Sequence, residues 1–406
     1  MNNLQRYNMK IISLFILFSL STTTVLSQEN GKMDHINSII ESVKNKYAPD
    51  KRVALFNIEA DESDSSYSLT GETNLPEAKM DLLEQLKKEN LQVKDEIKSL
   101  PAKELGEKIY GVINLSVANL RSNPDHPAEL STQSILGTPI KILKKGKGGF
   151  YLVQTPDGYI SWLDNGGFHA MTKDEINTWL KSDKIIYLED YGFAFSQPDK
   201  KSQRVSDLAI GNLLKLVSEE KEFYKVNFPD GREAFVKQDE CKLFKAWYAN
   251  VNPIAENILK EAHRFMGVPY LWGGTSSKGM DCSGFTKTVF YLNGIILPRD
   301  ASQQVHTGEL IDTENGWENL KPGDLLFYGS KASAERKERI THVSIYIGDG
   351  DFIHAAGRVQ INSFNPDKPY YSDYRKSGFI RAKRIINSIG TEGIEKILDN
   401  EFYKSK

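Results

Sequence analysis

One cysteine and two histidines in the C-terminal third have the residue types that thiol-based acyl transfer requires. Cys282 stands in "MDCSGF", directly behind Asp281, and His342 and His354 both lie in "THVSIYIGDGDFIHAAG". A thiol becomes a nucleophile when a neighbouring base takes its proton, and that base needs a partner to orient it. We therefore predict Cys282 as the nucleophile, His342 as the base and His354 as the orienting residue.

The elements that must position these residues follow from the pattern around them. The apolar residues after Cys282 recur at helical spacing, so they predict a helix with Phe285 on its buried face. Asp281 can cap that helix, and the free N–H groups and the dipole at its start favour a thiolate. The histidine segment predicts two strands joined through glycines, which brings the imidazoles together on neighbouring strands.

A metal site is the competing interpretation, because one cysteine and two histidines are also zinc ligands. The sequence offers no clear fourth ligand. The glycine-rich approach to Cys282, "YLWGG", suits a substrate better than a closed metal site. We therefore expect no metal and no cofactor.

Composition and the N-terminus bound the class of protein. The chain has 406 residues, a net charge of −2 and no long basic run, so no nucleic-acid partner is expected. Residues 1–27 pass from a basic start through "IISLFILFSL" to small residues, which predicts a cleaved signal peptide; an uncleaved anchor is the alternative. We expect an exported, soluble protein, periplasmic or extracellular, with no membrane association after cleavage.

The two cysteines of the chain lie in different settings. Export favours disulfides. Cys241, however, ends a strand-rich segment, whereas Cys282 begins a helix in another region. We therefore expect both thiols to stay free.

The middle of the chain contains an internal repeat. Segments starting at Gly137 and Gly211 share an apolar strand, a charged turn, Phe-Tyr, a Pro-Asp-Gly turn and a closing strand. The Asp-Gly pairs indicate hairpin turns. We predict an α+β protein with a small α+β module and two SH3-like β-barrels ahead of the C-terminal domain. The expected divisions are 28–109 for the module, 110–180 and 181–245 for the barrels, 253–385 for the catalytic domain and 386–406 for a helical tail.

Four consecutive motifs carry a resemblance to a known family. "YLWGGTSSKGMDCSGF", "LPRDASQQ", "LKPGDLLFY" and "THVSIYIGDGDFIHAAG" resemble those of NlpC/p60 cysteine peptidases over residues 253–385. The resemblance implies a papain-like fold, catalytic Cys282, His342 and His354, and peptidoglycan stem peptides as substrates. With two SH3-like domains in front, the architecture is similar to γ-D-glutamyl-L-diamino acid endopeptidases of the dipeptidyl-peptidase VI type, which act on peptides with a free N-terminal L-alanine.

The resemblance also implies substrate-binding residues. Tyr270 corresponds to a tyrosine beside the cysteine, and its hydroxyl can help to stabilise the oxyanion. Asp281, Ser283 and Ser302 correspond to residues that hold the alanyl amine and the D-glutamate α-carboxylate. Glu129 and Trp162 correspond to a glutamate and an aromatic residue of the first barrel. Their alternative roles are a packing tyrosine for Tyr270, a helix cap for Asp281, and an ordinary surface acid and core aromatic for the last two.

Two other functions fit the same sequence in part. A non-catalytic protein could use the barrels to bind the cell wall, but binding needs neither Cys282 nor the two histidines. An amidase or acyltransferase could share the fold, because the same acyl-enzyme can be resolved by other nucleophiles. We further expect Asp281 to be free to meet a cation, since His342 fills the role of base.

Overall fold

The computed structural model describes residues 31–63 and 66–405, so the predicted signal peptide lies outside the described residues. The chain divides into two compact units, one ending at Lys103 and the other beginning at Glu104. In the described part of the chain, no helix is long and apolar enough to cross a membrane.

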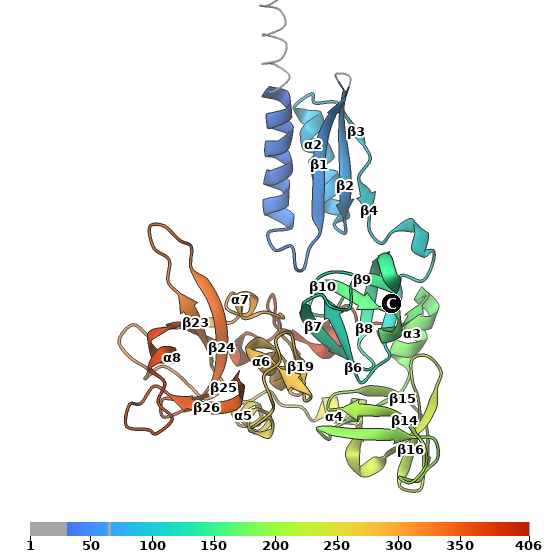
Figure 1. The fold of residues 1–406 in the computed structure, drawn as a ribbon, viewed down its shortest axis with the longest axis vertical. Helices are drawn as coiled ribbons and strands as arrows, with labels where there is room; N and C mark the ends of the chain where they lie inside the picture. Colours follow the sequence, from blue (N-terminus) through green and yellow to red (C-terminus); the bar gives the residue numbers. More distant parts are fainter. Residues whose placement is uncertain (1–30, 64–65, 406) are drawn as a thin grey trace, which may run out of the picture. The chain divides into compact units, whose positions relative to one another are not determined.

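The first unit is a small sheet covered by two helices. Residues 31–47 are helical, and α2 (Pro76–Lys88) is the second helix. Strands β1 (Phe56–Ser63) and β2 (Ser66–Thr73) pair antiparallel, and β3 (Val93–Asp95) and β4 (Lys98–Ser99) pair parallel with β2. Inward residues of β1 alternate with exposed ones, so one face of the sheet packs on both helices in a single core (Figure 1).

The first SH3-like domain is a seven-stranded antiparallel sheet in the order β11-β5-β8-β9-β10-β6-β7, followed by a helix. Its core contains apolar side chains from most of these strands. The elements are β5 (Tyr110–Ile113), β6 (Val117–Arg121), β7 (Leu130–Ile135), β8 (Pro139–Lys145), β9 (Phe150–Gln154), β10 (Ile160–Asp164), β11 (Phe168–Met171) and α3 (Lys173–Lys181).

The second SH3-like domain repeats this topology strand for strand, in the order β18-β12-β15-β16-β17-β13-β14. The predicted hairpin turns lie at equivalent places, and Gly158 and Gly231 take positive φ values of 79° and 88°, which glycine adopts without strain. The elements are β12 (Lys184–Tyr187), β13 (Tyr191–Phe195), β14 (Arg204–Ala209), β15 (Leu213–Glu220), β16 (Phe223–Asn227), β17 (Glu233–Lys237) and β18 (Cys241–Leu243).

The expectation of barrels needs correction, because neither sheet is closed. Among the described pairings, β7 does not join β11, nor does β14 join β18. Bulges at Leu120/Arg121 and at Ile142/Lys144 bend the first sheet around its core instead. The outer edge of β7 lies against the catalytic domain, where Gln133 accepts hydrogen bonds from Thr275, so this edge is covered rather than paired.

The C-terminal domain packs helices against a six-stranded sheet in the order β22-β27-β23-β24-β25-β26. Helix α6 contacts β24 on one side and β19 on the other, and β19 contacts β7 of the first SH3-like domain (Figure 1). This α+β arrangement confirms the predicted fold class. The elements are α4 (Phe244–Ala249), α5 (Ala255–Arg264), β19 (Thr275–Ser276), β20 (Gly279–Met280), α6 (Cys282–Tyr291), β21 (Ile295–Ile296), α7 (Ala301–Gln304), β22 (Glu309–Ile311), β23 (Leu325–Ser330), β24 (Arg339–Gly348), β25 (Asp351–Ala356), β26 (Arg358–Ser363), α8 (Asp373–Ser377) and β27 (Phe379–Arg384).

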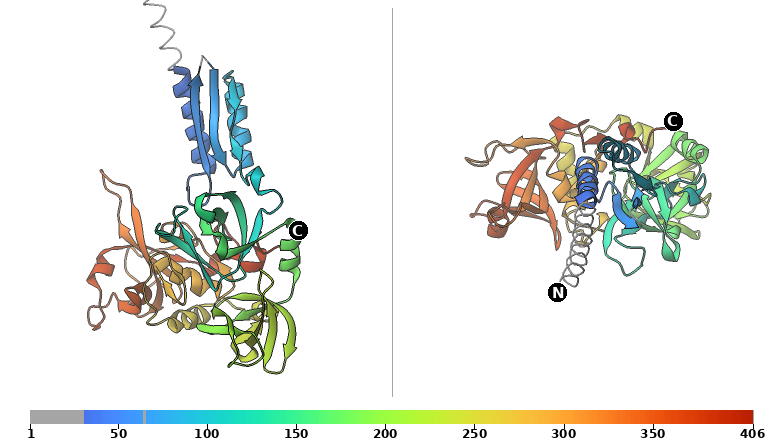
Figure 2. Two further views of the ribbon diagram at one scale, coloured as in Figure 1. Left: turned by 45° about the vertical axis from the view of Figure 1, so that its right-hand side comes forward. Right: turned by 90° about the horizontal axis from the view of Figure 1, so that it is seen from above.

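The expected helical tail is also wrong in detail. Residues 386–405 form two single 3-10 turns and strand β28 (Glu395–Lys396), which pairs with β21. The C-terminal end of the chain lies near the first SH3-like domain (Figure 2). There Asn400 donates to the carbonyl of Pro156, and Lys141 pairs with Glu401. Tertiary contacts therefore hold this segment, and it needs no helix of its own.

Candidate active site

Cys282 is the first residue of α6, as the sequence predicts. Asp281 is the N-cap, and its carboxylate accepts a hydrogen bond of 2.7 Å from the backbone N–H of Gly284. The backbone N–H groups of Ser283 and Val343 point toward the sulfur, which places it against β24 at the residue that follows His342. Cys241 lies in the core of the second SH3-like domain, and both thiols are free.

The two histidines meet across β24 and β25. Ile345 pairs with Ile353, so His342 and His354 lie on the same face as diagonal neighbours. His342 Nε2 is 2.7 Å from His354 Nδ1. His354 Nε2 is in turn 2.8 Å from Oδ1 of Asn362, on β26. All three side chains form one hydrogen-bonded row that ends on the strand next to the thiol.

Asn362 sets the proton positions along this row. Its amide nitrogen donates to the carbonyl of Tyr370, so its Oδ1 faces His354 and can only accept. Neutral His354 must therefore carry its proton on Nε2, which leaves Nδ1 as an acceptor for the Nε2 proton of His342. The Nδ1 of His342 is then left without a proton, as a general base requires.

Burial favours the neutral forms of the Cys282 thiol and the His342 imidazole. It raises the pKa of Cys282 to about 11, and the nearby Asp281 adds to this effect. Burial, followed by Arg375 and His354, holds the pKa of His342 well below its ordinary value, and burial lowers that of His354 to about 4. Loss of solvation thus opposes the thiolate that the helix-end N–H groups favour. The geometry favours proton transfer during attack instead.

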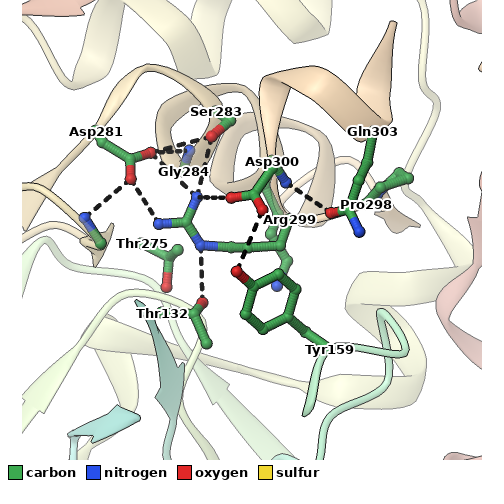
Figure 3. Close-up of polar contacts among 12 residues, drawn as sticks. Thr132, Tyr159, Thr275, Asp281, Ser283, Gly284, Pro298, Arg299, Asp300 and Gln303 are labelled. Carbon is green, nitrogen blue, oxygen red and sulfur yellow. Dashed lines mark hydrogen bonds and ion pairs between the residues drawn. The ribbon is translucent and has the colours of Figure 1, made fainter. Parts of the chain in front are cut away.

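Asp281 is not the free carboxylate that we expected. Arg299, only 1% exposed, donates to both of its oxygens, with an Nη2–Oδ2 distance of 2.6 Å (Figure 3). Burial lowers the pKa of Arg299, but Asp281 raises it by more, so the guanidinium stays charged. Asp300 lies 3.8 Å from the same guanidinium and accepts a hydrogen bond from Tyr159. Two carboxylates therefore lie beside one guanidinium.

The other predicted residues of this domain lie close to the same place. The Ser283 hydroxyl is buried between Asp281 and Arg299. Ser302 is half-buried on α7, which packs against β24. Burial, followed by Cys282 and Asp281, raises the pKa of Tyr270 well above its ordinary value, so its phenol remains a proton donor near the sulfur.

The structure separates the two residues predicted on the first SH3-like domain. Glu129 is exposed, and its Oε1 accepts a hydrogen bond of 2.7 Å from the indole of Trp272, two residues after Tyr270. Trp162 lies on β10, where it packs over Gly146 and under the Lys144 ammonium. Trp162 pairs with Arg121 and Leu152 within its own sheet, and its role in substrate binding stays a prediction.

Sequence reasoning missed Asn362, Arg299 and Arg375. The sequence did contain a signal for Asn362. A turn at Gly357 pairs His354 with Gln360, so Asn362, two positions after Gln360, lies on the same face of the sheet as His354. Arg299 lies inside the quoted motif "LPRDASQQ", but its burial against Thr132 of the first SH3-like domain is a tertiary fact. Arg375 stands in "SDYRKSGF", where nothing marks it as a site residue.

Comparisons with known proteins identify the family of the chain. The profile of the NlpC/P60 family matches residues 267–379, and that of the bacterial dipeptidyl-peptidase SH3 domain matches residues 120–167. A gamma-D-glutamyl-L-lysine dipeptidyl-peptidase of Bacillus cereus is 31% identical over 240 residues, covering 56% of this chain and 67% of the relative. The chain belongs to the NlpC/P60 family.

Further relatives and one solved structure extend the comparison. Dipeptidyl-peptidase 6 of Lysinibacillus sphaericus is 25% identical over 64% of this chain and 93% of its own length. The gamma-D-glutamyl-L-lysine dipeptidyl-peptidase of Bacillus subtilis is 32% identical, and the match spans 61% of that relative. A crystal structure of an NlpC/P60 family protein from Bacillus cereus matches with a TM-score of 0.58 at 24% identity, over 68% of this chain and 99% of the other. That likeness shows a shared fold.

Proposed function

We propose that the protein is a cysteine peptidase that hydrolyses the γ-D-glutamyl–diamino acid bond of peptidoglycan-derived peptides with a free N-terminal L-alanine. The observation that carries this proposal is the row of His342, His354 and Asn362 beside the Cys282 thiol. The substrate class rests on the names of the relatives, two of which are gamma-D-glutamyl-L-lysine dipeptidyl-peptidases.

In the proposed reaction, the thiol and the imidazole react as a neutral pair. As the Cys282 sulfur attacks the γ-carbonyl carbon, its proton moves to Nδ1 of His342, and the developing imidazolium is oriented by His354. The Tyr270 hydroxyl and N–H groups at the start of α6 stabilise the oxyanion. His342 then protonates the leaving amine, which releases the diamino acid. Water, activated by His342, hydrolyses the thioester and frees L-Ala-D-Glu.

The first SH3-like domain supports selection for a free amine. Buried polar contacts join it to the catalytic domain: Thr132 accepts from Arg299, Gln133 accepts from Thr275, and Asp157 pairs with Lys287. Glu129 lies on its edge beside Trp272. The Glu129 carboxylate at this edge favours an ammonium group over an acetylated one.

The test compares L-Ala-γ-D-Glu-L-Lys with its N-acetylated form, using the purified protein and mass spectrometry of the products. We expect cleavage at the γ-D-glutamyl bond and at least tenfold slower cleavage after acetylation, as loss of one charge-assisted contact of ~1.4 kcal/mol requires. Glu129→Gln keeps an acceptor for the Trp272 indole but removes the charge, so it should lower activity only on the free-amine peptide.

The matched control is Asp125→Asn, which removes an exposed charge from the same domain. Equal rates on the free and acetylated peptides would show that the SH3-like domains do not select for the free amine. They would then act as spacers or wall anchors. A transfer product with an added amine, in place of the free acid, would show an acyltransferase. We also propose export through residues 1–27, which N-terminal sequencing of the mature protein tests directly.

A further inference from the structure

Arg375, on the short helix α8, is a cation next to the catalytic row. Its guanidinium carbon lies 5.6 Å from the centre of the Tyr328 ring and 5.2 Å from that of Tyr374. Tyr328 is buried, and its ring centre is in turn 5.6 Å from that of His342. One aromatic ring therefore lies beside both the guanidinium and the general base.

This guanidinium has no counter-ion within the described residues. No carboxylate pairs with it, whereas Arg299, Arg381 and Arg384 of the same domain each form an ion pair. Arg375 is half-buried, and its field reaches Cys282 as well as both histidines. A partly desolvated cation without an anionic partner is costly, so its presence beside Cys282 indicates an anion that arrives with the substrate.

The position of Arg375 indicates which part of the substrate it meets. His342 protonates the leaving amine, so the leaving group must lie on the histidine side of the scissile carbonyl. The first SH3-like domain contacts the catalytic domain at other residues: Thr132 accepts from Arg299, and Glu129 accepts from Trp272. Helix α8 lies on the side of the six-stranded sheet away from that domain (Figure 1). The free cation thus faces the product that departs as an amine.

We propose that Arg375 binds the α-carboxylate of the diamino acid that follows the scissile bond. This inference rests on the function proposed above and adds a length requirement to it. That carboxylate is free only when the diamino acid is the last residue of the peptide. In longer stem peptides it is an amide, which offers no charge to the guanidinium. The enzyme therefore prefers tripeptides over tetrapeptides and pentapeptides. It recognises the free amine at one end of the substrate and the free carboxylate at the other.

The experiment compares L-Ala-γ-D-Glu-L-Lys with its C-terminal carboxamide. In the wild-type protein, kcat/KM should be higher for the acid. Arg375→Gln should lower kcat/KM for the acid about tenfold to a hundredfold and change that for the amide less than threefold, because only the acid can form the charge-assisted contact. Lys376→Gln is the matched control, since it removes an exposed charge from the same helix.

Two results would overturn the assignment. An equal loss on both peptides means that Arg375 acts on the fold or on the field at His342, and not on this carboxylate. A third peptide carries D-isoglutamine in place of D-glutamate. If the effect of Arg375→Gln disappears with this peptide, the guanidinium reads the D-glutamate carboxylate instead. The proposed function fails separately, if the wild-type protein cleaves neither the acid nor the amide at the γ-D-glutamyl bond.

Discussion

Replacing Asp281 by asparagine should destabilise the protein strongly, because it leaves the buried Arg299 without its main counter-ion. The Arg299 side chain is 1% exposed, and after the change only Asp300, at 3.8 Å, remains as a negative partner. Removing one member of a buried ion pair costs about 3–5 kcal/mol. The Gly284 N–H loses a charged acceptor as well, which adds to the loss.

Replacing the other partner of the pair, in Arg299→Met, should lower the free energy of unfolding by less. The Asp281 carboxylate keeps three donors, namely the N–H groups of Gly273 and Gly284 and the Ser283 hydroxyl. A carboxylate held by several N–H and O–H donors tolerates burial better than a bare guanidinium, so about 1–3 kcal/mol is expected. In the double variant the two losses should fall short of additivity by at least ~1 kcal/mol, because each single change already removes the pair.

Urea unfolding of the full-length protein, followed by tryptophan fluorescence, measures these free energies. The surface pair of Lys368 with Asp349, whose side chain is 86% exposed, provides the control, and Asp349→Asn should change stability by no more than about 1 kcal/mol. A loss of unfolding free energy below about 1 kcal/mol for Asp281→Asn, or strict additivity in the double variant, would refute this reasoning. The buried pair of Asp281 and Arg299 would then not stabilise the start of α6.

Three further predictions concern the Cys282 thiol and the row of His342, His354 and Asn362. Cys282→Ala should abolish hydrolysis with little change in stability. Iodoacetamide should label Cys282 before Cys241, because burial raises the pKa of the Cys241 thiol further than that of Cys282. Equal labelling of the two cysteines would contradict this prediction. Asn362→Ala should lower kcat at least tenfold with a small change in KM, whereas His354→Gln should retain part of the rate. An unchanged kcat for Asn362→Ala would show that the Asn362 amide does not set the tautomer of His354. Because burial lowers the pKa of His354 to about 4 from 6.5, the unfolded chain binds a proton there that the folded chain does not. That contribution to stability is complete above pH 6.5 and is lost as the pH falls toward 4, and urea unfolding should show a smaller decline for His354→Gln than for the wild type.

The sequence by itself determined the elements of the site whose geometry is local. Helical periodicity after Asp281 places Cys282 at a helix start, and the spacing of His342 and His354 around a glycine turn places both on one face of a sheet. The repeat of strands and Pro-Asp-Gly turns likewise predicts two domains with the same topology. These features follow from patterns with periods of two or 3.6 residues, which a single segment contains in full.

Only the tertiary structure decided which charges are satisfied. Asp281 reads as a free carboxylate in the sequence, but Arg299 reaches it across 18 residues and is held from the far side by Thr132 of another domain. The protonation of the thiol follows the same logic: a helix start favours a thiolate, yet burial beneath neighbouring elements raises the pKa of Cys282 to about 11. Desolvation and ion pairing depend on every group that surrounds a site, and those groups come from segments far apart in the chain.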